Sequence, residues 1–390
     1  MKKILIVNNN MHIGGVQKAL VSLLWNVQDR YEVTLLLFYP GGECLKDIPP
    51  RVRVITAKSP YRYLGITKTD DCGLLSRLCR SFYATLTRLM GRKYAVKLMS
   101  LGQKKLEGYD VAISYLHDGG EKVFYGGCND FVLNHVSAQK KITFLHCDYM
   151  LCGANTSENA KRYAQFDRIA ACSQGCAESF LQANPALREK VRVVYNCHRF
   201  SQIREAAEAA PVSLDSEKIN IVTVARLGKE KGVERALRAI AGLGPLKEKL
   251  HYYVIGDGIQ KAELLRIMEE EGLSPCVTMC GMLSNPYGYI KAADLLLIPS
   301  YSEAAPLVIG EAASLGTAVL STETSSAKEM LTDQGFGWVC ENSESGITKA
   351  LKELLTDPDR LTKLKNDLAQ ITVSNRVAAA QFAEILSNEM

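Results

Sequence analysis

The sequence has no apolar run close to the roughly 18 uncharged residues that a membrane-spanning helix needs. The apolar run after Lys2 and Lys3 is also too short for a signal peptide, and it predicts a first strand instead. Of the 390 residues, 47% are hydrophobic and 23% charged, as in ordinary globular proteins. At roughly 150 residues per domain, we expect two or three domains and a cytoplasmic location.

The sequence also lacks the cysteine spacing of common metal and redox sites. Its twelve cysteines include no CxxC pair. Cys172 and Cys176, like Cys276 and Cys280, are separated by three residues, which fits neither a zinc knuckle nor a thioredoxin site. We therefore expect reduced structural thiols and no metal site.

Charge is distributed unevenly along the chain. Residues 1–196 hold 27 Lys and Arg against 16 Asp and Glu, whereas residues 197–390 hold 20 against 26. The net charge of +5 therefore hides a basic first half joined to an acidic second half. This asymmetry indicates that the first half meets something anionic.

Short apolar segments alternate with helical patterns in both halves, which predicts a parallel α/β sheet in each. In the first half we expect strands at Ile4–Val7, Val33–Phe38, Val52–Thr56, Val111–Tyr115, Lys141–Leu145, Arg168–Cys172 and Val191–Tyr195. In the second half we expect them at Ile219–Val224, His251–Ile255, Val277–Met279, Leu295–Ile298, Ala318–Ser321 and Gly337–Val339. The fold class is thus α/β, with two Rossmann-like domains facing across a cleft where a ligand binds beyond the strand ends.

The domain boundaries follow from these patterns. We expect an N-terminal domain over 1–200, a linker over 201–218, and a C-terminal domain over 219–372. A last helix over 373–390 is expected to cross back to the N-terminal domain. Further helices are expected at 233–243, 259–272, 286–292, 306–315, 325–331 and, as a pair, 344–368.

The stretch from Pro299 to Ala312 is the most informative one for function. An apolar strand ends at Pro299, a polar loop follows, and a helix starts near Pro306. Glu303 then lies at the helix entrance, where backbone N–H groups gather. Glu311 lies inside the helix among apolar residues, where a carboxylate needs a partner such as a ligand hydroxyl. Taken alone, the two are equally compatible with ordinary helix glutamates.

This stretch resembles the signature of glycosyltransferase family 4, in which two Glu separated by seven residues follow Pro-Ser and precede a small-residue helix ending in Gly. The corresponding residues are Glu303, Glu311 and Gly316. The resemblance covers nearly the whole chain and recurs, in the same order, in the segments 194–196, 224–232, 254–258 and 281–283. Ala304 and Ala305 depart from the family, which usually has Gly and an aromatic residue there.

Cationic residues and glycines lie at two other predicted strand ends. Arg226 and Lys231 follow the strand Ile219–Val224 and, given the resemblance, are expected to neutralise a diphosphate without a metal. The alternative is that both residues are ordinary surface charges with no ligand. Gly14 and Gly15 lie between the first strand and helix, where the backbone can approach a phosphate closely. A purely structural turn is the alternative.

The candidates for catalysis and acceptor binding in the first half also lie at strand ends. His146 ends the strand Lys141–Leu145, and the family commonly places a His there, near the donor sugar and phosphate. A lone His without that resemblance is more often structural. We expect four nearby residues to contact the acceptor: His117, Asp118, Glu121 and Asp148.

The resemblance implies a retaining GT-B glycosyltransferase of the hexosyltransferase type, with a function in cell-surface polysaccharide synthesis. The donor is expected to be a nucleoside-diphosphate sugar, most often a UDP-sugar, with no metal cofactor. Catalysis is assigned to Glu303, Arg226, Lys231 and His146. Donor binding is assigned to Gly15, Arg226, Lys231, Met282, Leu283, Ala304, Ala305, Pro306, Leu307 and Glu311. A non-catalytic GT-B subunit and a sugar-nucleotide epimerase are the alternatives.

Residues 74–106 carry eight basic residues, no acidic residue, and apolar residues at near-helical spacing. A basic amphipathic helix of this kind can bind an anionic membrane surface. An ordinary domain helix with a basic polar face is the alternative. Because no aromatic platform accompanies the charge, nucleic acid is a poorer partner. We expect a saccharide or lipid-linked acceptor at the inner membrane face.

Overall fold

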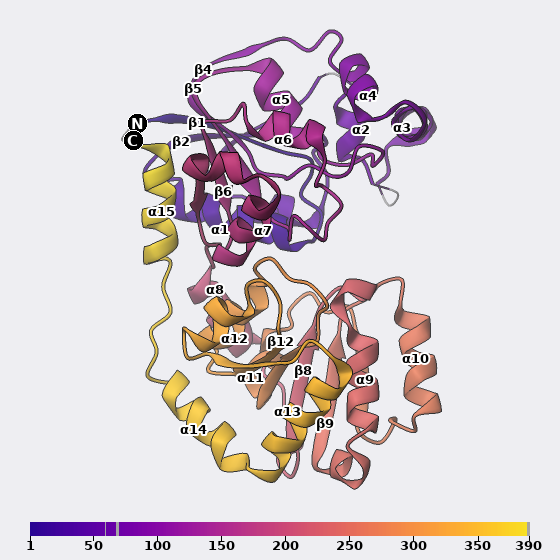
Figure 1. Ribbon diagram of the computed structural model, residues 1–390. Coiled ribbons are helices and arrows are strands. Elements are labelled where there is room, and N and C mark those ends of the chain that lie inside the picture. The colour runs from indigo at the N-terminus through magenta and orange to yellow at the C-terminus, as the bar shows by residue number, and fades with distance from the viewer. Residues whose placement is uncertain (59, 68–69, 388–390) are drawn as a thin grey trace. The chain divides into compact units, whose positions relative to one another are not determined.

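The computed structural model describes residues 1–58, 60–67 and 70–387, and it divides into two units (Figure 1). The N-terminal unit comprises Met1–Cys197 and the segment from Asn375 onward, and the C-terminal unit comprises His198–Ser374. Each unit is an α/β domain built on one parallel sheet.

The sheet of the N-terminal unit has seven strands in the order β3-β2-β1-β4-β5-β6-β7, and every pairing between neighbours is parallel. β1 is almost wholly buried after its first residue, as expected of a strand covered on both faces by helices. The strands are β1 (Lys3–Asn8), β2 (Glu32–Leu37), β3 (Arg53–Thr56), β4 (Leu106–Ser114), β5 (Val136–Leu145), β6 (Arg168–Ala171) and β7 (Val191–Val193). The helices of this unit are α1 (Gly15–Val27), α2 (Arg62–Gly65), α3 (Gly73–Met90), α4 (Arg92–Met99), α5 (Cys128–His135), α6 (Ser157–Tyr163), α7 (Gln174–Ala183) and α15 (Arg376–Leu386), with 3-10 turns η1 (Glu43–Asp47) and η2 (Pro185–Lys190).

The C-terminal unit repeats the design with a six-stranded parallel sheet in the order β10-β9-β8-β11-β12-β13. Its strands are β8 (Ile219–Val224), β9 (Leu250–Ile255), β10 (Val277–Gly281), β11 (Leu295–Ile298), β12 (Ala318–Thr322) and β13 (Gly337–Cys340). Its helices are α8 (Phe200–Ala209), α9 (Val233–Ala241), α10 (Lys261–Glu270), α11 (Tyr287–Ala292), α12 (Leu307–Ser314), α13 (Glu344–Thr356) and α14 (Pro358–Leu368). Three short turns complete it: η3 (Lys229–Lys231), η4 (Gly244–Lys249) and the π-turn η5 (Lys328–Thr332).

The last helix, α15, packs on the N-terminal unit, where Figure 1 shows it in yellow. Its buried residues Phe382 and Leu386 join the core formed around β1 and α1. The ring of Tyr31 contacts that of Phe382 edge-on at 6.3 Å between centroids. The predicted return of the C-terminal helix is therefore confirmed, while the last three residues of its predicted range lie outside the described part of the chain.

The predicted strands end within two residues of the observed ones, but β4 and β5 each begin five residues earlier than predicted. Their early residues are mostly exposed or half-buried, so they carry no apolar pattern. The predicted linker was wrong in one respect, because it contains α8, a helix of the C-terminal unit. Ile203 and Ala207 are the buried residues of α8, and its short alanine-rich pattern gave little signal. None of the helices in the described ranges is both long and apolar enough to cross a bilayer.

Candidate functional site

The loop over 299–306, which carries Glu303 and is called the glutamate loop below, lies at the carboxyl edge of the C-terminal sheet. All four residues of β11 are buried, because this central strand has neighbours on both sides and helices on both faces. Polar loop residues then lead to α12, whose N-cap residue Pro306 has extended backbone and whose first residue is Leu307. Neighbouring β8 ends at the same edge and continues into η3.

Glu303 and Lys231 meet between these two loops. The Lys231 Nζ atom lies 2.7 Å from Glu303 Oε1, which also accepts a hydrogen bond of 2.7 Å from the Ser300 hydroxyl. The two side chains are only 24% and 11% exposed, so their charges are partly shielded from water. The loops are joined a second time by the backbone, because Tyr301 N donates to the Glu230 carbonyl. The pair therefore places one cation and one carboxylate side by side at the strand ends.

Arg235, which the sequence analysis did not identify, braces the glutamate loop. It is buried on α9 and donates to the carbonyl of Pro299 at 2.6 Å and to that of Ser300 at 2.5 Å. Its guanidinium also lies 3.9 Å from the ring centroid of Tyr301. A buried arginine that satisfies loop carbonyls fixes the backbone on which Glu303 stands. The sequence of α9 gives little sign of this role, because Glu234 and Arg238 are also charged and Arg235 does not stand out among them.

Two glycines allow the loops of the carboxyl edge to approach one another. Gly232 has a positive φ of 61°, and a Cβ there would lie 2.1 Å from the Pro299 carbonyl oxygen. Gly256 has a φ of 145°, and a Cβ there would lie 1.8 Å from the Ala225 carbonyl oxygen. Both positions need glycine for packing alone. The glycines in the segments 224–232 and 254–258 are therefore explained by backbone packing alone, without a bound ligand.

The second predicted cation, Arg226, is far more exposed than Lys231. Its side chain is 76% exposed and pairs with Glu230 at 2.6 Å, four residues along the chain. An exposed ion pair of this kind is weak and exchanges readily with solvent. Arg226 is thus free to reorient toward a ligand, whereas Lys231 is already held.

Glu311 is buried on α12, with a side-chain oxygen 3.4 Å from the Tyr287 hydroxyl on α11. The ring of His198 lies against Gly310 of the same helix, where a Cβ would be 2.6 Å from Nε2. Burial lowers the pKa of His198 to about 4, so this ring is neutral at pH 7. Met282 is exposed, and the other predicted donor contacts are half-buried: Leu283, Ala304, Ala305, Pro306 and Leu307.

In the N-terminal unit, Gly15 is the first residue of α1, after the extended N-cap residue Gly14. A Cβ added at Gly15 would meet no described atom within 4 Å, and its φ is not positive. Packing therefore does not require glycine at this position, in contrast to Gly232. A ligand that approaches the backbone is a remaining reason for it.

His117 and His146 follow the neighbouring strands β4 and β5. Burial lowers the pKa of His117 to about 4, and burial together with His117 lowers that of His146 to about 3. Within the described residues, His117 Nδ1 and His146 Nε2 are buried with no hydrogen-bond partner. Both rings are therefore neutral at pH 7 and retain capacity for a further hydrogen bond.

Asp118 does not suit the predicted acceptor contact. Its side chain is fully buried and binds Arg92 at 2.5 Å, Arg162 at 3.2 Å and Asn129 at 2.8 Å. Arg92 and Arg162 also bind Asp130, at 2.7 and 2.9 Å. Burial raises the pKa of Asp118, but the two arginines and Asn129 more than offset this and leave it lowered. Sequence position alone placed Asp118 at a strand end without revealing this charge network, which occupies both oxygens of its carboxylate.

The other two predicted acceptor residues are accessible to different extents. Asp148 is half-buried and accepts a hydrogen bond of 2.6 Å from the Ser179 hydroxyl on α7, which orients its carboxylate. Glu121 is exposed, and its carbonyl accepts a hydrogen bond from the Arg92 backbone N–H.

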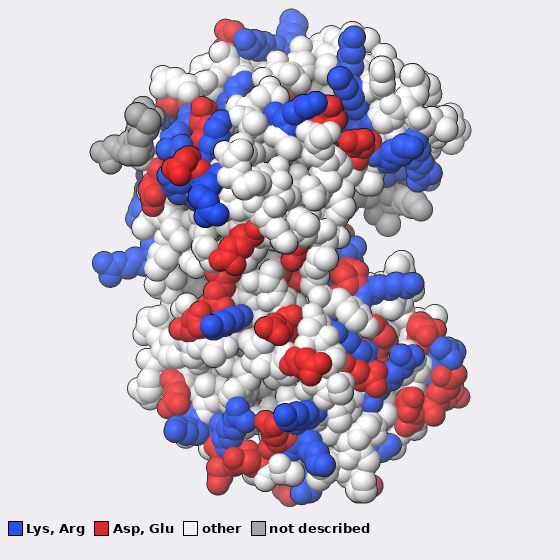
Figure 2. Space-filling view, in the orientation of Figure 1, with Lys and Arg blue, Asp and Glu red and all other residues white. Residues whose placement is uncertain are grey.

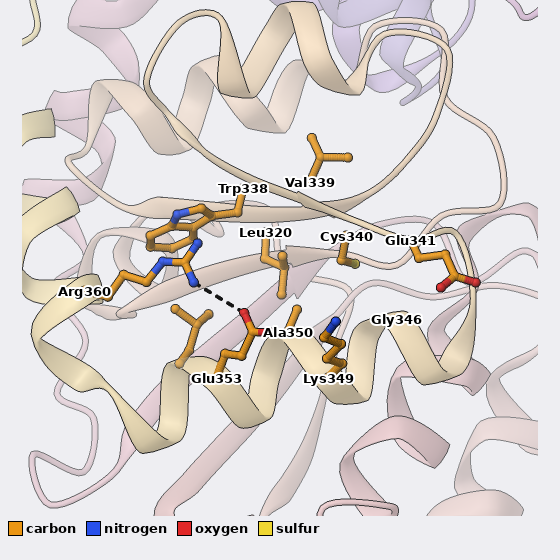
Figure 3. Close-up of a pocket in the computed structure, with 11 residues that line it drawn as sticks. Leu320, Trp338, Val339, Cys340, Glu341, Gly346, Lys349, Ala350, Glu353 and Arg360 are labelled. Carbon is orange, nitrogen blue, oxygen red and sulfur yellow. Dashed lines mark hydrogen bonds and ion pairs between the residues drawn. The ribbon is translucent and has the colours of Figure 1, made fainter.

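A pocket of about 270 Å³ lies elsewhere in the C-terminal unit (Figure 3). It is lined by residues of β12, β13, α13 and α14, where Arg360 binds Glu353 at 3.4 Å and lies over the ring of Trp338. None of the predicted site residues lines it. In the described ranges, no group of three or more His, Cys, Asp or Glu is placed to hold a metal ion.

Residues 205–370 match the family described as glycosyl transferases group 1. One curated relative is the N-acetylgalactosamine-N,N'-diacetylbacillosaminyl-diphospho-undecaprenol 4-alpha-N-acetylgalactosaminyltransferase of Campylobacter jejuni, 30% identical over 210 residues. The match covers 53% of this chain and 56% of that protein. The amylovoran biosynthesis glycosyltransferase AmsK of Erwinia amylovora is 28% identical, over 44% of this chain and 45% of its own. The chain thus spans about half the length of the curated relatives that it matches.

Solved structures resemble the whole chain. HepE of Anabaena in complex with UDP and glucose aligns with a TM-score of 0.67 at 18% identity, covering 99% of both chains. WaaG, a glycosyltransferase involved in lipopolysaccharide biosynthesis, aligns with a TM-score of 0.60 at 17% identity, covering 99% of this chain and 100% of its own. The predicted GT-B fold is confirmed by this likeness and by the two parallel sheets.

Proposed function

We propose, on the premise that residues 205–370 belong to the glycosyl transferases group 1 family, that the chain transfers a sugar from a nucleoside-diphosphate sugar to an acceptor. The acceptor is a saccharide or a lipid-linked saccharide, and the product belongs to a cell-surface polysaccharide. The names of the curated relatives support this class of reaction.

The observation that carries the proposal is the Lys231–Glu303 pair on a loop braced by Arg235. Sugar transfer separates a positively charged, oxocarbenium-like ring from a diphosphate leaving group. A cation beside a carboxylate, held by preorganised backbone, suits both charges as they develop. Lys231 and Arg226 are assigned to the diphosphate, Glu303 to the sugar hydroxyls, and Glu311 to the ribose.

In the proposed reaction, the bond between the anomeric carbon and the diphosphate oxygen breaks while the acceptor oxygen bonds to the same face of that carbon. The acceptor proton passes to the leaving phosphate oxygen, so the enzyme needs no nucleophile of its own. The products are the glycoside, with retained configuration, and the nucleoside diphosphate. The donor is a UDP-sugar, and the UDP in the HepE complexes supports this choice of base.

Residues of the N-terminal unit complete the assignment. The Gly15 N–H group binds an anionic group of the substrate. His146 and His117, both neutral, offer hydrogen bonds near the reacting groups, and Glu121 and Asp148 contact the acceptor. The protein works in the cytoplasm at the inner membrane face, and no metal takes part.

Incubation with a panel of UDP-sugars and lipid-linked saccharides tests the proposal. We expect free UDP and a new glycoside, detected by mass spectrometry, with the anomeric configuration read by NMR. An epimerised sugar nucleotide without free UDP would instead identify an epimerase. No UDP binding in calorimetry and no product with any donor would identify a non-catalytic subunit.

A further inference from the structure

Helix α3 lies at the edge of the N-terminal unit (Figure 1) and exposes several large apolar side chains. Five of them are between 57% and 77% exposed: Leu74, Leu75, Leu78, Phe82 and Leu89. A single exposed leucine is unremarkable in a globular protein, but five on one helix form a contiguous apolar surface. We call these five residues the α3 stripe.

The α3 stripe lies on the side of the helix away from the domain core. At about 100° per residue, its five positions fall within an arc of about 100°. The residues that attach α3 to the domain lie outside this arc: Thr87 is buried, and Tyr83 and Leu86 pack partly buried against the core. The stripe is therefore additional to the apolar surface that holds the helix in place.

Basic residues accompany the stripe, and residues 73–99 contain no Asp or Glu. Arg88 flanks the stripe on one side of α3, as does Arg77, which also donates to the Asp70 carbonyl at 3.3 Å, and Lys93 and Lys97 are exposed on α4. Figure 2 shows basic side chains next to uncharged surface at this edge of the unit. An apolar strip with cations beside it complements an anionic lipid surface, where acyl chains lie next to negative headgroups.

The structure also shows that some residues of 74–106, the segment predicted to contact the membrane, are not available for it. Arg92 is buried in the charge network with Asp118 and Asp130. Arg80 donates to the Ile66 carbonyl at 2.7 Å, and Leu86 is partly buried. These three residues hold the domain together and are left out of the surface.

We propose that the α3 stripe inserts into the interfacial region of an anionic bilayer while Arg88, Lys93 and Lys97 bind its headgroups. The helix lies in the plane of the membrane and does not span it. Its role in bringing a lipid-linked acceptor to the N-terminal unit rests on the proposed function, but the lipid binding itself does not.

Vesicle sedimentation with the full chain tests this surface. We expect binding to vesicles of phosphatidylcholine with 30% phosphatidylglycerol, weak binding to pure phosphatidylcholine, and partial release as salt rises, since only the headgroup contacts are screened. Two variants separate the two contributions. Leu78→Ser/Phe82→Ser/Leu89→Ser removes the apolar contacts, and Arg88→Glu/Lys93→Glu/Lys97→Glu reverses three exposed charges.

Each variant has a matched control made of exposed residues elsewhere. The apolar control is Val54→Ser/Leu265→Ser/Val377→Ser. The charge control is Lys349→Glu/Lys352→Glu/Lys363→Glu, which changes the net charge by the same amount. We expect both α3–α4 variants to lower the vesicle partition coefficient about tenfold or more, and both controls to change it less than about twofold.

Three outcomes would overturn the proposal: equal binding to neutral and anionic vesicles, no binding to either, or equal losses in variants and controls. A fourth is self-association without lipid binding, seen as a dimer in sedimentation velocity that the serine variant abolishes. Calorimetry with UDP on the same samples measures donor-site binding independently of lipid binding. Lipid binding without UDP binding would reject the proposed function and leave this surface standing.

Discussion

The Lys231 ammonium lies 2.7 Å from the Glu303 carboxylate, although the two residues are 72 positions apart in the chain. The pair joins the loop after β8 to the loop after β11 at the carboxyl edge of one sheet. Arg235 donates a hydrogen bond to the Pro299 carbonyl, and Gly232 lets the loops approach each other there because it has no side chain. The geometry brings short motifs that are scattered along the chain to the same edge of the sheet.

We predict that Lys231→Ala will lower kcat/KM about 30- to 1000-fold, or about 2–4 kcal/mol in transition-state stabilisation. Arg226→Ala should cost less, because Arg226 is 76% exposed and its charge is better screened than that of Lys231. Lys229→Ala, in the same 3-10 turn, is the matched control and should stay within about twofold. Initial rates with and without EDTA measure all three, and turnover that EDTA abolishes while Lys231→Ala stays active would contradict the assignment.

The two glutamates should separate in their effects. Glu303→Gln is expected to reduce kcat about tenfold or more with little effect on UDP affinity, because its contacts are assigned to the sugar. Glu311→Ala should weaken UDP binding by roughly 10- to 100-fold, the usual worth of a hydrogen bond to a charged group. Calorimetry with UDP on both variants measures this, and equal losses of affinity would remove the distinction.

Much of the fold was predictable because parallel strands buried on both faces leave continuous apolar runs, such as Leu295–Ile298. The start of β4 and helix α8 were not, because their residues lack such a pattern. Positions at the strand ends, including Glu303 and Lys231, could be identified from the order of the short motifs along the chain and from their resemblance to glycosyltransferase family 4. The contacts of Asp118 and Arg235 could not, since they depend on partners far away in the sequence.

Gly15→Ala should separate stability from activity. The free energy of unfolding is expected to stay constant or rise by up to about 1 kcal/mol, since alanine favours helix over glycine and the site is open. Turnover should fall about tenfold or more, because the new methyl group occupies the space of a bound anion. Gly232→Ala is the contrasting variant and should destabilise the protein, as its Cβ would collide with the Pro299 carbonyl. Full activity in Gly15→Ala would assign Gly15 to the turn alone.

Asp118→Ala should destabilise the N-terminal unit by about 3–5 kcal/mol, because it leaves buried guanidinium groups short of a counter-charge. Asp29→Ala, which breaks an exposed pair with Arg51, should change stability by no more than about 1 kcal/mol. Urea unfolding measures both. If Asp118→Ala keeps wild-type stability and loses only acceptor turnover, Asp118 belongs to the acceptor site after all.

The last prediction concerns pH. His117, His146 and His198 have folded pKa values of about 4, 3 and 4, lowered chiefly by burial, against about 6.5 in the unfolded chain. Below pH 6.5 the unfolded state therefore binds protons that the folded state does not, so stability is fully present above pH 6.5 and falls as the pH drops toward 4. Each histidine adds a slope of up to about 1.4 kcal/mol per pH unit.

Urea unfolding between pH 6.5 and 5 isolates this effect, because most carboxylates titrate at lower pH. His117→Gln/His146→Gln should flatten the slope in that window by up to about 1.4 kcal/mol per pH unit for each ring removed, and its slope should match the wild type above pH 7. The physical cause is the removal of two groups whose protonation opposes folding, while burial also lowers the pKa of His198, His135 and His251, which stay in the variant. Parallel curves for variant and wild type below pH 6.5 would mean that both rings take up protons in the folded protein, and that neither is held neutral in the site.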